Sequence, residues 1–176
     1  MHEDDQAERH RLGLAAAQGH AKAQFALGVM HHRGEGGPAD FAEARRLYGL
    51  AAAQGHAPAQ FNLGLMQHLG QGGPVDSAEA RRLYELAAAQ GHADAQYNLG
   101  VMHRYGEGGP VDFAEARRLF GLAAAQGNAK AQCNLCSRGA QRVLRYGDME
   151  YVMLHLIFIY LMPGEGQPAA YAASDL

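Results

Sequence analysis

Apolar residues recur at three- and four-residue spacing in short blocks along most of the chain. One block covers residues 21–33 and the next covers residues 40–54. Such spacing brings apolar side chains to one side of an α-helix, so we predict one amphipathic helix for each block. The buried sides predicted in this way consist of Ala23, Leu27, Met30 and His31 in the first helix and of Ala44, Leu47, Tyr48, Ala51 and Ala52 in the second.

A glycine-rich turn separates the two predicted helices. Residues 34–38 read Gly-Glu-Gly-Gly-Pro. Glycine interrupts a helix by its flexibility, and proline does so because it lacks an N–H group. Asp40 is a favourable N-cap for the second helix, and Glu43, three residues later, would complete a capping box. Gly55 ends the second helix, at a position that favours a left-handed backbone.

The helix pair recurs with a period of 36 residues. Residues 57–92 and 93–128 are identical at 25 of 36 positions. A period of this length is typical of solenoids, in which stacked units share one continuous core. We predict one solenoid domain at residues 1–136, made of a half repeat at 5–20, full repeats at 21–56, 57–92 and 93–128, and a partial repeat from residue 129.

Glycine also recurs in the middle of the first helix of each repeat, as Gly28, Gly64 and Gly100. A glycine inside a helix costs about 1 kcal/mol relative to alanine. Because all three full repeats keep it, we predict that two backbones approach each other there too closely for a side chain.

The charged residues exclude one large class of function. The formal net charge is −3, with acidic and basic residues interspersed, whereas a protein that binds nucleic acid needs a basic stripe. We therefore expect no nucleic-acid partner. An Arg-Arg pair follows a glutamate in the second helix of each repeat, and we expect these side chains to form a solvated, self-neutralising face. The pairs are Arg45-Arg46, Arg81-Arg82 and Arg117-Arg118.

The cysteines and the first residues indicate a reducing compartment. Only Cys133 and Cys136 occur, which is too few for a disulfide framework. We interpret them as small core residues of a degenerate repeat. Residues 1–5 are acidic and lack the residue order of a secretory signal. We therefore predict a cytoplasmic protein, and we do not expect a membrane to be its partner.

The sequence contains no set of residues with the spacing of a catalytic or metal-binding site. His20, His56 and His92 recur once per repeat, about 10 Å apart by helix-packing distances, which is too far for one ion to bridge. The glycine-rich loops lack the Lys-Ser/Thr pair of a phosphate-binding loop. No Ser/His/Asp set or Ser-x-x-Lys motif can be assembled. We therefore predict no enzyme activity, no metal site and no cofactor.

The repeat motif resembles the Sel-1-like repeat, a relative of the tetratricopeptide repeat. It reads Ala-x-Ala-Gln-Phe/Tyr-Asn-Leu-Gly-x-Met, Gly-x-Gly-Gly-Pro, Asp-x-Ala-Glu-Ala-Arg-Arg-Leu-Tyr/Phe and Ala-Ala-Ala-Gln-Gly-His. The resemblance covers about residues 5–135. It implies an all-α, right-handed superhelical solenoid of antiparallel helix pairs, with the first helix of each repeat on the concave side. It also implies a role as a scaffold or adaptor for protein complexes.

Two features depart from this family or from its best-known function. The family often places an aromatic residue after the methionine of the first helix, where this chain has His31, Gln67 and His103. We expect looser packing or polar contacts along that seam.

Some relatives with a cysteine pair in each repeat are described as binding or hydrolysing β-lactams, which leaves an enzyme of that kind as an alternative. This chain has no such pairs.

The concave side of the first helices is the predicted binding surface. Asparagine recurs there with the period of the repeat, and its side chain both donates and accepts hydrogen bonds. A row of asparagines could therefore hold the main chain of an extended peptide from a protein partner. The alternatives are a solvated face and a hydrogen-bond ladder within the array. The predicted peptide-binding residues are Asn62, Asn98, Asn134, Leu65, Val101 and Tyr105.

The repeat pattern ends near Cys136, and the sequence beyond it has a different character. Residues 151–162 form an apolar run, shorter than the roughly 20 residues of a membrane-spanning helix. We predict a divergent helical cap at residues 137–162, since the end of a solenoid needs covering, and a disordered tail at residues 163–176. Two alternatives remain for the apolar run: an exposed anchor, and a truncated or frame-shifted gene end. A further alternative for the whole chain is a repeat fragment that has no role of its own.

Overall fold

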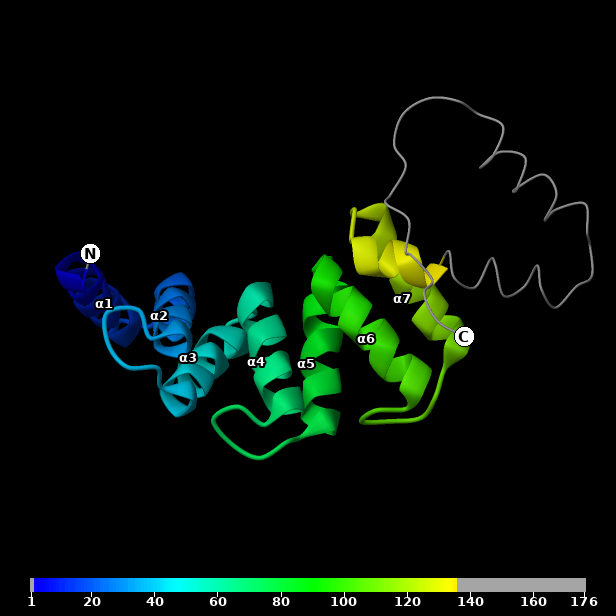
Figure 1. Cartoon of the computed structure of the whole chain (residues 1–176), viewed down its shortest axis with the longest axis horizontal. Coiled ribbons are helices and arrows are strands. Elements are labelled where there is room, and N and C mark those ends of the chain that lie inside the picture. The colour runs from blue at the N-terminus through cyan, green and yellow to red at the C-terminus, as the bar shows by residue number, and fades with distance from the viewer. Residues whose placement is uncertain (1, 136–176) are drawn as a thin grey trace, which may run out of the picture. The chain divides into compact units, whose positions relative to one another are not determined.

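The computed structural model describes residues 2–135, and all regular secondary structure within them is helical. The helices are α1 (His2–Ala17), α2 (Ala21–Arg33), α3 (Phe41–Ala53), α4 (Ala57–Leu69), α5 (Ser77–Ala89), α6 (Ala93–Tyr105) and α7 (Phe113–Ala125), and a last helical segment spans residues 129–135. Figure 1 shows α1 to α7 following one another in chain order. The predicted all-α solenoid of repeated helix pairs is confirmed. The predicted cap at 137–162 and tail at 163–176 lie outside the described residues.

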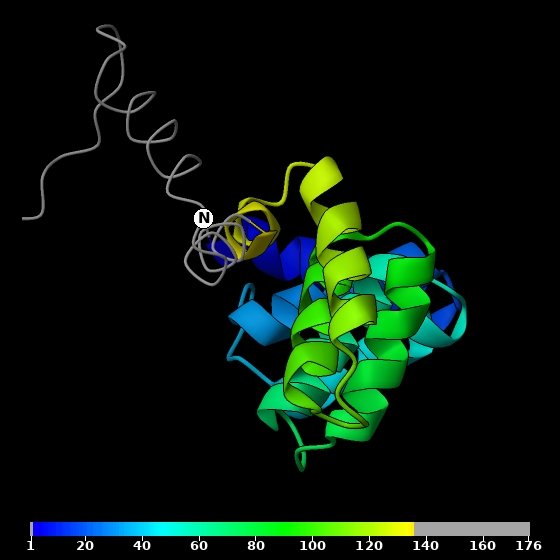
Figure 2. The same cartoon turned by 90° about the vertical axis from the view of Figure 1, so that its right-hand side faces the viewer.

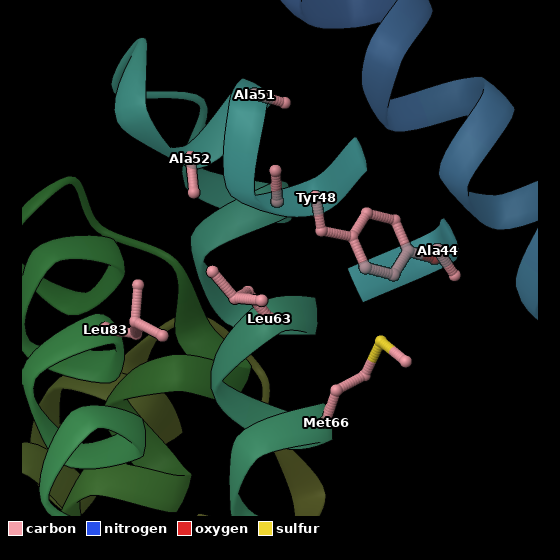
Figure 3. Packing of buried hydrophobic residues seen from close by; sticks show 8 residues of the cluster. Ala44, Tyr48, Ala51, Ala52, Leu63, Met66 and Leu83 are labelled. Atoms are coloured by element: carbon pink, nitrogen blue, oxygen red, sulfur yellow. The ribbon is translucent and has the colours of Figure 1, made fainter. Parts of the chain in front are cut away.

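Two kinds of helix alternate along this part of the chain. We call α2, α4 and α6 the A helices and α1, α3, α5 and α7 the B helices; residues 129–135 continue the A series. Each helix packs mainly against the helices before and after it in the sequence, as Figures 1 and 2 show. The apolar stripe predicted for α3 is confirmed, because its five residues are all buried. In Figure 3 the ring of Tyr48 lies in the core that α3 forms with Leu63 and Met66 of α4.

An aspartate caps each of the B helices α3, α5 and α7. Oδ1 of Asp40 accepts a hydrogen bond from the backbone N–H of Glu43 at 3.0 Å, and Asp76 and Asp112 make the same contact. The second half of the predicted capping box is wrong. The backbone N–H of Asp40 already donates to the carbonyl of His31. The carboxylate of Glu43 therefore accepts two hydrogen bonds from Arg46 instead.

The glycine in the middle of each A helix makes room for an aromatic ring. A Cβ atom at Gly64 would lie 2.9 Å from Cε1 of Tyr84, and the equivalent glycines of the other two repeats face equivalent rings at 2.8 Å. The prediction of a close approach is therefore confirmed: the nearest neighbour is a ring of the B helix, and at Gly64 and Gly100 a backbone carbonyl of that helix also lies 3.3 Å from the Cβ position. The glycine thus allows α4 and α5 to pack with a full tyrosine side chain between them.

Arginines join successive repeats, although the sequence analysis placed them on a solvated face. The side chain of Arg81 is buried, and its guanidinium donates to the carbonyl oxygen of Pro110 at 3.3 Å and to Nδ1 of His103 at 2.9 Å. Arg45 makes the equivalent contacts with the repeat that follows it. The prediction is wrong for these two arginines because their side chains reach the loop and the A helix of the next repeat. The second arginine of each pair binds a glutamate, as expected.

The same contacts explain the polar residues that replace an aromatic one in the A helices. Each of them bonds the arginine of the preceding repeat: His31 bonds Arg9, Gln67 bonds Arg45 and His103 bonds Arg81. A guanidinium group has no acceptor, so the histidine or glutamine must accept. The expectation of polar contacts along this seam is confirmed.

The glycine-rich loop lies directly against the preceding B helix. Gly72 has a φ angle of +70°, and a Cβ atom there would lie 2.3 Å from the carbonyl oxygen of Phe41 in α3. The guanidinium group of Arg45 fills the space beside Gly73. Glycine is therefore required at position 72 both by the left-handed backbone and by the backbone that lies against it.

Buried amides link three helices in each repeat. Gln60 is 4% exposed; its Nε2 donates to the carbonyl of Ala52 at 3.2 Å and its Oε1 accepts from Gln90 at 2.7 Å. These bonds connect α3, α4 and the end of α5. Gln24 and Gln96 repeat the arrangement. The sequence analysis did not single out these glutamines, although they recur with the period of the repeat.

Candidate peptide-binding site

The predicted binding residues lie on the side of the A helices that does not carry the apolar stripe. We call this surface the A-face and define it by Asn62, Leu65 and Leu69 of α4 and the equivalent residues of the neighbouring A helices. A pocket of about 190 Å³ opens on it between α2 and α4. The pocket is lined by Val29, His32, Arg33, Tyr48, Asn62, Leu65, Met66 and Gln71.

Tyr48 is a buried residue of the pocket lining, and polar side chains act on its hydroxyl. Tyr48 is 2% exposed, and burial raises the pKa of its hydroxyl. A hydrogen bond with the side chain of Asn62 and the positive charge of Arg33 act against this rise in pKa. Asn62 therefore has one partner inside the array, which corresponds to the hydrogen-bond ladder named as an alternative, and its half-buried side chain also lines the pocket.

The next junction, between α4 and α6, carries equivalent groups, but Leu69 stands there in place of Arg33. Burial raises the pKa of Tyr84 to about 12, the Asn98 side chain acts against the rise, and the negative charge of Glu107 adds to it. The Tyr84 hydroxyl is buried without a well-formed hydrogen bond. Glu107 replaces the Gln71 of the first junction, and its carboxylate lies 3.7 Å from Nε2 of His68. Burial is the largest cause of the raised pKa at both tyrosines, and the smaller effect of a nearby charge lowers the pKa of Tyr48 and raises that of Tyr84.

The remaining predicted residues have different surroundings. Asn134 is half-buried; its Oδ1 accepts from Arg104 at 2.9 Å and its amide donates to the carbonyl of Lys130 at 3.1 Å. Val101 packs against the buried cluster around Phe120. Tyr105 is 61% exposed at the end of α6, with the Arg104 guanidinium 5.3 Å from its ring centre. Of the six residues, Asn62 and Leu65 are the two that share the pocket.

The pocket also contains residues that were not predicted to bind, and Tyr48, His32 and Gln71 are polar ones among them. Tyr48 was placed in the buried stripe of its helix, which is correct for its ring but leaves out its hydroxyl. His32 and Gln71 belong to neighbouring repeats, and Nε2 of His32 lies 3.3 Å from Oε1 of Gln71. A signal for Tyr48 was present in the sequence, because a buried tyrosine hydroxyl requires a polar partner and Asn62 and Asn98 follow Tyr48 and Tyr84 at the same offset.

The recurrent histidines occupy the N-cap positions of the A helices, and among them the side chain of His92 makes a capping hydrogen bond. Nδ1 of His92 accepts a hydrogen bond from the backbone N–H of Ala95 at 3.3 Å, and its ring stacks on Phe61 with centroids 4.7 Å apart. His56 lies in the same place before α4. Among the residues that the structure describes, no three histidine, cysteine, aspartate or glutamate side chains come together to hold a metal ion.

The cysteine prediction is wrong where it can be examined. Cys133 is exposed and not a core residue, and Cys136 lies outside the described residues. Cys133 holds the position of Phe61 and Tyr97 in the earlier A helices. Phe61 packs against the histidine that follows the next B helix, and residues 129–135 have no such element after them in the described part of the chain.

We expect four histidines with a lowered pKa to make the fold sensitive to acid: His31, His56, His92 and His103. Burial is the largest cause that lowers their pKa below 6.5, and an arginine lowers it further at His31 and His103. The folded protein therefore favours the neutral imidazoles, and the unfolded chain binds protons first as the pH falls. Their contribution to stability is full above about pH 6.5 and is lost as the pH falls through the lower folded pKa.

We expect the double variant His31→Gln, His103→Gln to lose less stability than the unaltered protein between about pH 7.5 and about pH 5.5. Glutamine at native position 67 accepts the equivalent bond from Arg45 without titrating, so the variant keeps the contact. Because His56 and His92 remain, the acid-dependent loss should fall by about half. Urea unfolding at the two pH values measures it. An unchanged loss in the double variant would show that the arginine-bonded histidines do not cause the acid sensitivity.

No helix within residues 2–135 combines the length and the apolar character needed to cross a bilayer.

Comparison with known proteins identifies the repeat. The family model of the Sel1 repeat matches residues 21–56, 57–92 and 93–128. A crystal structure of a protective antigen of uropathogenic Escherichia coli with the SLR fold is similar over 70% of this chain, with 41% sequence identity and a TM-score of 0.68. That of a Sel1 repeat protein from Oxalobacter formigenes is similar over 78%, with 31% identity and a TM-score of 0.74.

The chain covers 27% of the length of the Escherichia coli protein and 55% of that of the Oxalobacter protein. The search of curated proteins gave no match. Sel1 repeat proteins are generally scaffolds for protein–protein interaction and are typically not catalytic. The three matched repeats and the shared architecture show that the chain belongs to the Sel1 repeat family.

Proposed function

We propose that this protein is a non-enzymatic scaffold that binds a peptide segment of a protein partner on its A-face. The pocket between α2 and α4 is the observation that supports the proposal. Its wall combines the apolar side chains of Val29 and Leu65 with the amide of Asn62 and the charge of Arg33. Such a mixture of apolar surface and a few polar groups is typical of a site that holds a ligand by shape and fixes its orientation by hydrogen bonds.

The proposed surface continues from the pocket along the A helices. Asn98 and Val101 hold the positions of Asn62 and Leu65 in the next repeat, and Asn134 continues the row in residues 129–135. Leu69 and Tyr105 are 55% and 61% exposed at the ends of α4 and α6. Exposed apolar residues of this size, beside half-buried amides, offer a peptide both contact area and main-chain hydrogen bonds.

Site-specific photo-crosslinking tests the proposal. A photoreactive phenylalanine analogue at Leu69 is expected to capture partner segments from a cell extract, and the same group at Leu86 is expected to capture few. The two positions are a matched pair, because Leu69 is 55% exposed on the A-face and Leu86 is 41% exposed on a B helix. Equal capture at both positions, or capture only at Leu86, would place binding elsewhere and refute the proposal.

A further inference from the structure

The pocket between α2 and α4 has the size of a site for one side chain. Its volume of about 190 Å³ is smaller than the roughly 300–1,000 Å³ of sites that enclose a drug-sized molecule. At about 30 Å³ for each water molecule, it would hold about six waters. We therefore expect the pocket to receive a single side chain of the bound peptide, while the rest of the peptide lies on the A-face.

The charge in the pocket lining is positive. Among the described residues that line the pocket, Arg33 carries a permanent charge and none is an aspartate or a glutamate. The side chain of Arg33 is 66% exposed, and its Nη1 lies 3.5 Å from Oε1 of Glu35, a residue outside the lining. An ion pair between two exposed groups at this distance is weak. The guanidinium group of Arg33 can therefore exchange Glu35 for a carboxylate of the ligand.

The apolar part of the lining suits the stem of that side chain. Val29 of α2 and Leu65 and Met66 of α4 belong to the lining. Methylene groups that pack against them leave water, which stabilises the bound state. A glutamate side chain carries its carboxylate on a longer aliphatic stem than an aspartate does. Glutamate therefore combines the charge that Arg33 requires with the apolar surface that the wall requires.

Two amides supply further hydrogen-bond donors. Oε1 of Gln71 lies 3.3 Å from Nε2 of His32, and this contact leaves the N–H groups of the Gln71 amide to other partners. The Asn62 amide also lines the pocket and uses part of its hydrogen-bonding capacity on the hydroxyl of Tyr48. A carboxylate only accepts hydrogen bonds, so it matches N–H donors better than a group that donates.

The equivalent surface one repeat further along the chain lacks this chemistry. Leu69 holds the position of Arg33 there, and Glu107 holds the position of Gln71. The carboxylate of Glu107 lies 3.7 Å from Nε2 of His68. An acidic side chain at this second junction would meet a like charge in place of an arginine, which disfavours binding. The comparison of equivalent positions therefore assigns the selection of an acidic side chain to the first junction.

We propose that the pocket between α2 and α4 is a specificity pocket for one glutamate side chain of the bound peptide, with the glutamate carboxylate paired to Arg33. This inference rests on the proposed function and adds to it the residue type that the scaffold selects in its partner. The ligand carboxylate and Glu35 compete for the same guanidinium group, so Glu35 limits the affinity of the pocket.

Selection from a random peptide library tests the inference. The library consists of short peptides with an acetylated N-terminus and an amidated C-terminus, and the immobilised full-length protein captures peptides from the mixture. Mass spectrometry of the captured peptides is expected to show glutamate enriched about fivefold over glutamine, relative to the library before capture, because a partly exposed ion pair contributes modestly to affinity. The enrichment should shrink in high salt.

Three variants separate the pocket from a general attraction between opposite charges. Arg33→Leu places at position 33 the residue that occurs naturally at position 69, and it should abolish the enrichment. Glu35→Gln removes the competing carboxylate and should increase the enrichment. Arg46→Leu is the matched control, because Arg46 is an exposed arginine of α3 that also pairs with a glutamate, and it should leave the enrichment unchanged. Circular dichroism checks that all three variants fold.

Glutamate enrichment that persists in Arg33→Leu, or that falls equally in Arg46→Leu, would overturn the inference. Absence of any glutamate enrichment would do the same. A second library with free C-terminal carboxylates covers the other source of this chemistry: capture that depends on Arg33 and occurs only with that library would show that the pocket binds a chain end and not a glutamate side chain. The crosslinking comparison of Leu69 and Leu86 decides the proposed function independently of all these outcomes.

Discussion

Replacing Gly72 with alanine is expected to lower the free energy of unfolding by about 3 kcal/mol. Two effects add at this position. The φ angle of +70° places the residue in the left-handed region, which costs an alanine about 1–2 kcal/mol. The new Cβ atom would also lie 2.3 Å from the carbonyl oxygen of Phe41, a backbone atom that cannot move without shifting the start of α3. Urea unfolding followed by circular dichroism measures the loss.

Gly91→Ala is the control that separates the two effects. Gly91 has a φ angle of +87°, and nothing lies within 4 Å of the place where its Cβ atom would be. This variant should therefore lose about 1 kcal/mol, from backbone strain alone. Equal losses in the two variants would mean that the contact between the glycine-rich loop and the preceding B helix adds nothing to the requirement for glycine at position 72.

Local signals predicted most of this fold because each of them depends on residues close in the sequence. The stripe of α3, its cap at Asp40 and its end near Gly55 all follow from spacing and backbone preference within a few residues. The period also predicted which helices pack together, because an apolar stripe that recurs every 36 residues has to be buried against copies of itself. The mid-helix Gly64 illustrates the limit, since its spacing predicted a close contact but not that the ring of Tyr84 makes it.

Contacts between repeats were mispredicted where a side chain had two credible partners. Glu43 precedes two arginines in the sequence; helix spacing pairs it with Arg46, three residues later, and the structure shows that Arg45 reaches the next repeat. A charged residue near an opposite charge on a helix is normally solvated, so the general rule favoured the wrong assignment for Arg45. The offset of 22 residues between Arg45 and Gln67 recurs in the other repeats, but sequence periodicity does not tell which recurring offsets are contacts.

The sequence predicted only part of the candidate site. Asn62 and Leu65 were found because they recur on one side of the A helices, and both line the pocket. Tyr48 and Gln71 were missed as binding residues because they belong to a B helix and to the loop after α4, and only tertiary packing brings both of them to the pocket beside α2.

Replacing Arg81 with methionine is expected to lower the free energy of unfolding by about 2–3 kcal/mol. Methionine keeps most of the aliphatic length of the side chain, so the change removes mainly the charged hydrogen bonds. In the native protein the buried guanidinium donates to the carbonyl of Pro110 and to His103, and its Nε lies 3.6 Å from Glu85. Loss of these bonds leaves the Pro110 carbonyl and the His103 ring without the donor that joins two repeats.

Arg117→Met is the matched control, because Arg117 holds the position of Arg81 on α7 and is exposed. Its loss should stay within about 0.5 kcal/mol, as for an ordinary surface substitution. A loss at Arg81 no larger than at Arg117 would show that the arginine bridge contributes little to the junction. The apolar contacts between helices would then have to account for the coupling of neighbouring repeats alone. The expected difference would instead show that the Arg81 side chain couples two neighbouring repeats. Interfaces of this kind between neighbours are what stabilise an array of stacked repeats.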